Sequence, residues 1–143
     1  MQKRLTDNVA FKLVENATQL ADGANALSAY TRKMGDSLAF AIALKYTADG
    51  DATYAISLTE CDTVGGSYTA VASAEQSGNG TYTQAQLAAL GQPNCPILNY
   101  LGGKKFIKVN ITTANITDNV NTVYSRATVL AIESGCKLQS AGM

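Results

Sequence analysis

The sequence predicts an all-β chain, an antiparallel β-sandwich of jelly-roll or related Greek-key type with one short helix. Three observations support this fold class. Large apolar residues alternate with small or polar residues in several short segments, which is typical of strands that bury one face. Turn residues, chiefly Gly, Asp and Asn, separate these segments at intervals of about 8–12 residues. The sequence contains no repeat of about 20–50 residues, so a solenoid is not predicted.

Residues 1–36 have the weakest strand pattern. Their spacing predicts a short strand over 9–14 and another extended piece over 26–32, separated by the turn dipeptide Asp22-Gly23. This segment is therefore either the first strands of the sandwich or an arm that orders only against a neighbour.

Residues 37–134 are predicted to form the core of the sandwich. The clearest strand covers 37–46, where large apolar residues stand at every second position. The opposite face of this strand carries the small residues Ala39, Ala41 and Ala43. A solvated strand face usually carries polar side chains, so these alanines indicate a second packed surface, inside the domain or between copies of it.

The later elements follow from the same signals. Thr83 and Gln86 have the spacing of a capping box and precede an apolar run that ends at Gly91, which predicts one short helix over 84–90. The remaining predictions are a turn at 49–51, a loop at 76–80, a short polar tail at 135–143, and strands over 54–58, 68–72, 97–100, 105–113 and within 120–133.

Composition excludes several classes of function. The chain has 143 residues, which predicts one domain, and its 11 basic and 11 acidic residues give a net charge of zero. That balance does not favour binding to nucleic acid or to an anionic membrane, and it favours association between proteins. No segment approaches the about 20 apolar residues that span a bilayer, and the start lacks the apolar core of a secretory signal. We therefore expect a soluble protein made in a cytoplasm.

Residue types that support catalysis are scarce. The chain has no His, so a Ser, Thr or Cys nucleophile lacks the commonest general base, and no Ser-x-x-Lys motif replaces it. Glu60 and Asp62 are the only suggestive carboxylate pair. They are compatible with a calcium or acid–base role, although the simpler interpretation is a polar strand end. We expect no enzyme, no cofactor and no metal.

Three cysteines, Cys61, Cys95 and Cys136, lie far apart in the sequence. They are most simply free thiols buried as small apolar residues, and one disulfide with a spare thiol is the alternative. Without His and without short ligand spacing they do not form a zinc motif. The tyrosines could line a sugar-binding groove, but most of them stand at core positions of predicted strands and the chain has no Trp.

Two segments carry a resemblance to a known group. Residues 56–71 (ISLTECDTVGGSYTAV) and 99–111 (NYLGGKKFIKVNI) resemble the strand–turn–strand units of small virion proteins of tailed bacteriophages. The likeness extends over 37–112, and the group includes capsid cement, or decoration, proteins. In that group such proteins are β-sandwich modules, commonly homotrimers, that sit at local threefold positions on the shell.

The resemblance implies a non-enzymatic structural protein of the capsid exterior that binds the major capsid protein and stabilises the shell. Binding to nucleic acid or to a membrane is not implied. The arm at 1–16 and two apolar surfaces, at 39–43 and 129–132, are the candidate contacts. For the basic residues near the start, solvated charge is the simpler interpretation, and contact with an acidic partner surface is the alternative. The candidate partner-binding residues are Lys3, Arg4, Phe11, Lys12, Arg32, Lys33, Ala39, Ala41 and Ala43.

Two alternatives from other classes stay open. One is a receptor- or carbohydrate-binding module of a phage fibre, which would expose clustered tyrosines. The other is a head–tail connector or tail-tube component, which would assemble into rings.

Overall fold

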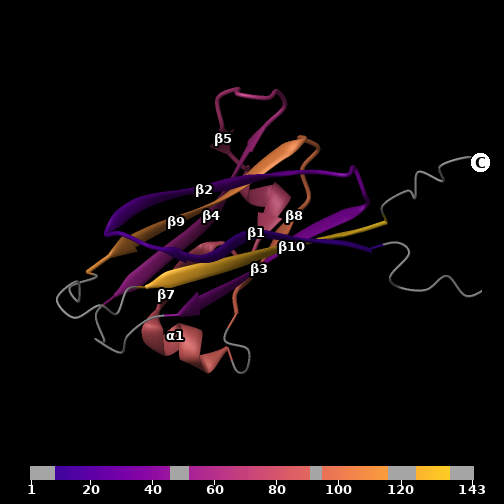
Figure 1. Ribbon diagram of the computed structural model, residues 1–143. Helices are drawn as coiled ribbons and strands as arrows, with labels where there is room; N and C mark the ends of the chain where they lie inside the picture. The colour runs from indigo at the N-terminus through magenta and orange to yellow at the C-terminus, as the bar shows by residue number, and fades with distance from the viewer. Residues whose placement is uncertain (1–8, 46–51, 91–94, 116–124, 136–143) are drawn as a thin grey trace, which may run out of the picture.

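The computed structural model describes residues 9–45, 52–90, 95–115 and 125–135. They form two antiparallel sheets of five strands each, packed face to face, with one short α-helix at one end (Figure 1). The prediction of an all-β sandwich with one short helix is confirmed.

The first sheet has the strand order β1 (Val9–Gln19), β10 (Arg126–Ser134), β3 (Ser37–Lys45), β8 (Ile97–Tyr100) and β6 (Gln76–Ser77). The second sheet has the order β2 (Gly23–Thr31), β9 (Phe106–Ala114), β4 (Thr53–Cys61) and β5 (Thr69–Ala70), and β7 (Gly80–Thr83) also pairs with β4. A 3₁₀ turn, η2 (Ser73–Glu75), precedes β6, and the helix α1 (Gln84–Ala89) follows β7.

The strand pairings are nested in the manner of a jelly roll. Strand β1 pairs with β10, β2 with β9, β3 with β8 and β4 with β7, all antiparallel. This is the pairing of one long hairpin that has been folded into a sandwich. Successive strands from β1 to β4, and again from β6 to β10, therefore alternate between the two sheets. Because β1 and β2 lie within this nest, residues 9–31 belong to the sandwich.

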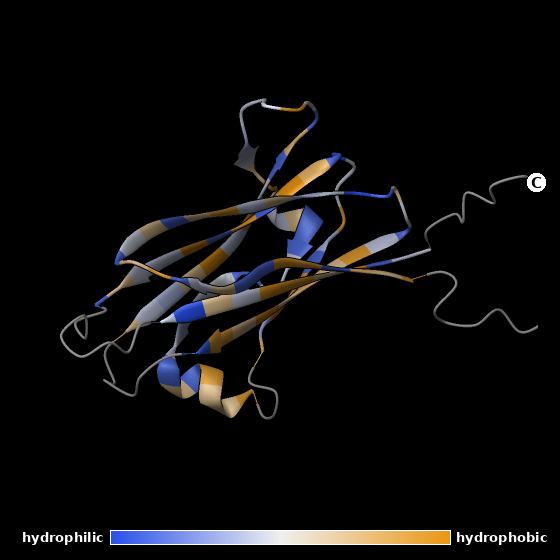
Figure 2. Cartoon of the chain, in the orientation of Figure 1, coloured by the Kyte–Doolittle hydropathy of each residue, from blue (hydrophilic) through white to orange (hydrophobic). Residues whose placement is uncertain are grey.

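The core lies between the sheets and follows from the alternation of the sequence. On β3, Leu38, Phe40 and Ile42 point inward and are almost fully buried. The inward faces of β4, β9 and β10 are buried in the same way, and orange segments recur along these strands in Figure 2. The ring of Phe40 meets that of Tyr30 edge to face, with the centroids 6.0 Å apart.

Strand β1 is longer than predicted because its pairing is irregular. Its register against β10 shifts between Leu13 and Glu15 and again between Glu15 and Thr18, and Ala17 has a positive φ of 49°. Each bulge adds a residue and breaks the period of two, so alternation alone ends the strand too early. Strand β2 has a similar shift between Ala26 and Ala29.

The helix is confirmed, and the predicted loop at 76–80 is partly wrong. The Thr83 hydroxyl accepts a hydrogen bond from Gln86 N at 3.2 Å, and Thr83 N donates to Gln86 Oε1 at 2.9 Å, which completes the capping box. Within 76–80 the short strands β6 and β7 form on either side of a turn at Gly78, where φ is +82°. The predictions for 49–51, 120–124 and 136–143 fall outside the described residues.

Candidate interaction surface

The outward side of the first sheet carries a continuous apolar surface. In an antiparallel sheet, residues directly opposite one another point to the same side. Phe11 is opposite Ile132, which is opposite Ala39, and in the next row Leu13 is opposite Leu130, Ala41 and Ile97 in turn. We call this surface the apolar face and define it by residues from β1, β10, β3 and β8: Phe11, Leu13, Ala39, Ala41, Ile97, Leu130 and Ile132.

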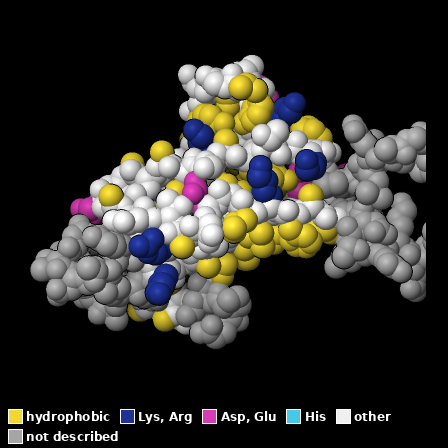
Figure 3. Space-filling model, viewed as in Figure 1, with side chains coloured by type: hydrophobic (Ala, Val, Ile, Leu, Met, Phe, Trp, Pro, Cys, Tyr) yellow, Lys and Arg dark blue, Asp and Glu magenta, His cyan; other side chains and the backbone are white. Residues whose placement is uncertain are grey.

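Large side chains of the apolar face are exposed. Phe11 is 61% exposed, Leu13 51% and Ile97 46%. Figure 3 shows a continuous band of hydrophobic side chains along the lower side of the view, over the region of β10 and β3 in Figure 1. An exposed apolar patch that is continuous across several strands is typical of a surface that contacts another protein.

Charge is placed only at the ends of this side of the sheet, as far as the described residues go. Ser37 and Ser134 flank the face at one end, and Thr128 and Ala43 continue it towards the other. Beyond them, Lys45 and Arg126 lie opposite each other at the end of the paired strands. Asp36, which is exposed, stands at the opposite end, immediately before β3.

The outward side of the second sheet is different in character. Its strands β9 and β4 point Thr, Ser and Asn side chains outward, among them Thr112, Asn110, Ser57 and Thr59, and Asn110 Nδ2 donates to Thr59 Oγ1 at 2.9 Å. Lys108 lies 4.1 Å from the ring centroid of Tyr68 on this side. One sheet therefore presents the polar surface that is usual for a solvated sheet and the other does not.

A buried polar network lies at the end of the sandwich where β10 ends. Glu133 is fully buried, and its carboxylate accepts hydrogen bonds from the Tyr30 hydroxyl at 2.9 Å, Lys33 N at 2.6 Å and Gly35 N at 2.7 Å. Arg32 Nε lies 3.7 Å from Glu133 Oε2. The carboxylate thereby holds the connection between β2 and β3 against the core.

Arg32 joins this connection to the one between β8 and β9. Its Nη1 donates to Gly102 O at 2.9 Å, and its Nη2 donates to Gly35 O at 3.1 Å. The guanidinium carbon also lies 5.4 Å from the ring centroid of Tyr100. These contacts use the guanidinium inside the fold, where it stabilises two loops.

Tyr100 extends the network to β4. Its hydroxyl donates to Glu60 Oε2 at 2.6 Å and accepts a hydrogen bond from Lys104 N at 2.9 Å. Burial, together with the hydrogen bond to Glu60, raises the pKa of Tyr100 above its ordinary value, so the phenol is neutral at physiological pH. At the surface, Lys104 Nζ donates to Asp62 Oδ2 at 2.7 Å, and this hydrogen bond raises the pKa of Lys104.

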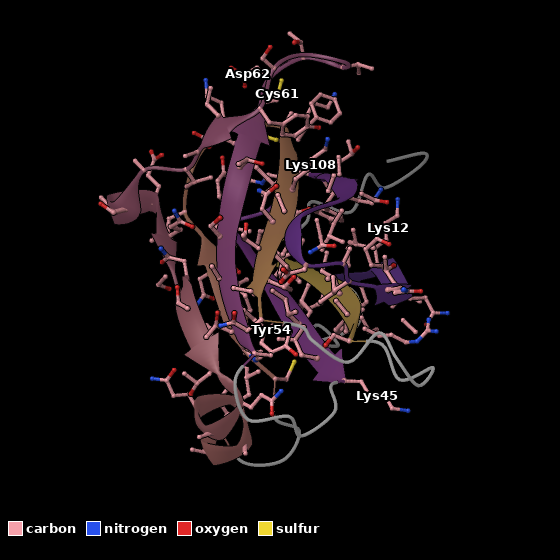
Figure 4. All side chains as sticks on the ribbon, turned by 90° about the vertical axis from the view of Figure 1, so that its left-hand side faces the viewer. Lys12, Lys45, Tyr54, Cys61, Asp62 and Lys108 are labelled. Atoms are coloured by element: carbon pink, nitrogen blue, oxygen red, sulfur yellow. The ribbon has the colours of Figure 1, made fainter. Side chains whose placement is uncertain are left out.

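The candidate basic residues do not gather on the apolar face. Arg32 is buried, only 8% exposed, and belongs to the network. Lys33 is exposed in the connection after β2. Lys12 is exposed on β1 (Figure 4). It lies between Phe11 and Leu13 in the strand, so it has the opposite parity and is not on the apolar face. Lys3 and Arg4 lie outside the described residues.

The candidate apolar residues do lie together. Phe11, Ala39 and Ala41 are members of the apolar face, and Ala43 continues it along β3. Within 129–132 only Leu130 and Ile132 point outward, because Val129 and Ala131 face the core. Leu13 and Ile97 were not candidates, since only the pairing of strands reveals that they share this side.

Among the described residues, the carboxylate pair and the two thiols Cys61 and Cys95 do not gather into a cluster of ligands. Glu60 is buried against Tyr100, whereas Asp62 is exposed beyond the end of β4 (Figure 4). Cys61 and Cys95 are free thiols, and burial raises the pKa of Cys95. In the described part of the chain, no three His, Cys, Asp or Glu side chains are placed to hold a metal ion. The described helix is too short to cross a membrane.

Two of the tyrosines considered for a sugar-binding groove, Tyr54 and Tyr100, are fully buried. The hydroxyl of Tyr54 is within 2.9 Å of Ser125 Oγ in the interior. Tyr68 and Tyr82 are half-buried; Tyr82 lies on β7, and Tyr68 lies immediately before β5. The described tyrosines therefore do not present a shared exposed groove.

Comparisons with models of protein families, with curated proteins and with solved structures gave no match for this chain.

Proposed function

We propose that the protein is a non-enzymatic structural subunit of a larger protein assembly, and that it acts by packing its apolar face against protein surfaces. The observation that carries this proposal is the apolar face on the outward side of the first sheet, with Phe11 61% exposed, Leu13 51% and Ile97 46%. Burying apolar surface contributes about 25 cal/mol per Å² removed from water, so such a face favours association.

The specific form we propose is a capsid cement protein of a tailed bacteriophage, whose partner is the major capsid protein of the same virion. The likeness of residues 37–112 to small virion proteins supports this form. The jelly-roll sandwich suits the role, because rigid sheets fix the relative positions of the side chains that contact a partner. A protein that binds only the assembled shell stabilises that shell by mass action.

Shell binding tests the proposal. Purified protein would be mixed with phage shells that lack a cement protein, the shells would be pelleted, and their melting would be followed by calorimetry. We expect the protein to sediment with the shells and to raise their melting temperature. Failure to bind shells from the phage that encodes the protein would contradict the cement function.

A matched pair of variants separates specific from non-specific binding. Leu130→Gln places a polar side chain on the apolar face, whereas Thr112→Gln places the same side chain on the outward side of the second sheet. We expect Leu130→Gln to weaken the stabilisation of shells and Thr112→Gln to leave it unchanged. Equal effects of both substitutions would show that the apolar face is not the surface in use.

A further inference from the structure

We infer that the apolar face is covered by a second copy of this chain, packed face to face about a two-fold axis with the strands of the two copies antiparallel. The inference rests on the proposed function only in taking the apolar face as a protein-binding surface. It names the occupant of that surface in the free protein, where no shell competes for it, and it differs from the trimer that the sequence resemblance implies.

The outward side of the first sheet, which comprises the apolar face and the residues that flank it, is large enough for a two-fold contact. Strands β3 and β10 have nine residues each, β8 has four, and β1 is paired with β10 along its length. With strands about 4.8 Å apart and a rise of about 3.3 Å per residue, these strands present about 500 Å² of sheet. Two copies would cover about 1,000 Å² in total, which reaches the size expected of a biological interface.

The chemistry of the face suits contact with itself. A two-fold interface places the same patch of both subunits together, so any charge within the patch would meet its own kind. The apolar face has no charged member. Two such sheets can pack about 10 Å apart with interdigitating side chains, as the sheets of a sandwich do.

The charges at the two ends of this side of the first sheet select the relative direction of the strands in the two copies. Asp36 stands immediately before β3, and Lys45 and Arg126 lie opposite each other where β3 ends. Antiparallel packing places Asp36 of each copy over Lys45 and Arg126 of the other, whereas parallel packing would bring these like charges together. Complementary charge of this kind fixes the orientation of an interface.

The use of one sheet face also selects the number of copies. In a three-fold ring each subunit contacts its two neighbours through two different surfaces. One sheet face packed on an identical face uses a single surface and closes with two copies. The geometry therefore predicts a dimer.

Sedimentation of the full chain over a range of concentrations tests this inference. We expect a species of twice the 15.0 kDa chain mass. The double variant Leu13→Gln/Leu130→Gln should weaken the dimer at least tenfold, and the control Ser57→Gln/Thr112→Gln on the second sheet should not. A persistent monomer, a species of three chains, or a dimer insensitive to the first variant would each overturn the inference.

A charge exchange tests the direction independently of the apolar variants, in case these fold poorly. Asp36→Lys and Lys45→Glu should each weaken the dimer, and the two together should restore it in part. Additive weakening would overturn the antiparallel arrangement. The outcomes separate from those of the proposed function: a monomer that still stabilises shells removes only the dimer, and a dimer that binds no shell removes only the cement role.

Discussion

Glu133 shows how a carboxylate can be held in the core of a weakly charged protein. It accepts three hydrogen bonds and lies beside Arg32. Removing ions from water is costly, and the pair is retained only if hydrogen bonds and the opposite charge compensate. The network thus determines the conformation of the connection between β2 and β3 at this end of the sandwich.

We predict that Glu133→Gln lowers the free energy of unfolding by about 3–5 kcal/mol, because it leaves the buried Arg32 guanidinium without its counter-charge. Urea denaturation monitored by circular dichroism measures this loss of stability. The control is Asp62→Asn, which breaks the exposed ion pair with Lys104 and should change stability far less. Similar losses in both variants would show that the buried pair has no special role.

Two adjacent glycines give a second prediction at the residue scale. A Cβ at Gly102 would lie 2.5 Å from the Tyr100 hydroxyl and 2.6 Å from its Cζ, whereas a Cβ at Gly103 meets no atom within 4 Å. Because the ring of Tyr100 is fully buried, it cannot move aside freely. We expect Gly102→Ala to lower stability by about 1–3 kcal/mol, the usual cost of overpacking, and Gly103→Ala to be nearly neutral in thermal melting.

The edge strands β1 and β2 are tied together by Glu15. One carboxylate oxygen accepts a hydrogen bond from Ser28 N at 2.6 Å and the other from the Thr18 hydroxyl at 2.5 Å. Burial alone would raise the pKa of Glu15, but these hydrogen bonds outweigh it and lower the pKa below 4.5. Glu15 therefore links the first strand of one sheet to the first strand of the other.

This shift predicts a pH dependence of stability. A carboxyl whose pKa is lower in the folded state stabilises the fold above its unfolded pKa, near 4.5, and this contribution is lost as the pH falls through the folded pKa. Glu15→Gln should therefore be less stable than the wild type at pH 7, and the difference should shrink below pH 4.5. A difference that stays constant across this range in denaturation curves would show that ionised Glu15 does not contribute.

Alternation predicted the regular strands and failed where pairing is irregular. The segments that became β3, β4 and β9 were recognisable because each buries every second residue. The end of β1 was not, since its bulges interrupt that period. The sequence also could not show that Arg32 is internal, although Glu133, a charge at a core position of its strand, was a usable signal.

The apolar face was predictable only in part for a similar reason. The alanines of β3 indicated a second packed surface from their pattern alone. Leu13 and Ile97 lie on β1 and β8, which come from distant parts of the sequence. Only the register of strand pairing places them on the same surface. Register depends on tertiary pairing, which a single strand's composition does not specify.

At the scale of the whole molecule, the two sheets have opposite characters. Most outward side chains of β9 and β4 in the second sheet are polar, whereas Phe, Leu, Ile and Ala side chains form a continuous surface on the first. A sheet face that stays in water usually carries polar side chains, and the apolar face of the first sheet does not. The account therefore depends on the apolar face being covered in the working state, whether by a second copy or by a shell.

Fluorescence of an introduced Trp tests this claim most directly, because the chain contains no Trp. The variant Ile97→Trp places the reporter on the apolar face, and Thr112→Trp places it on the second sheet as a control. Quenching by acrylamide would be measured in dilute protein, in concentrated protein and on shells. The account predicts that the Trp at position 97 becomes shielded on assembly while the one at 112 stays accessible. Equal accessibility of both reporters in every state would contradict it.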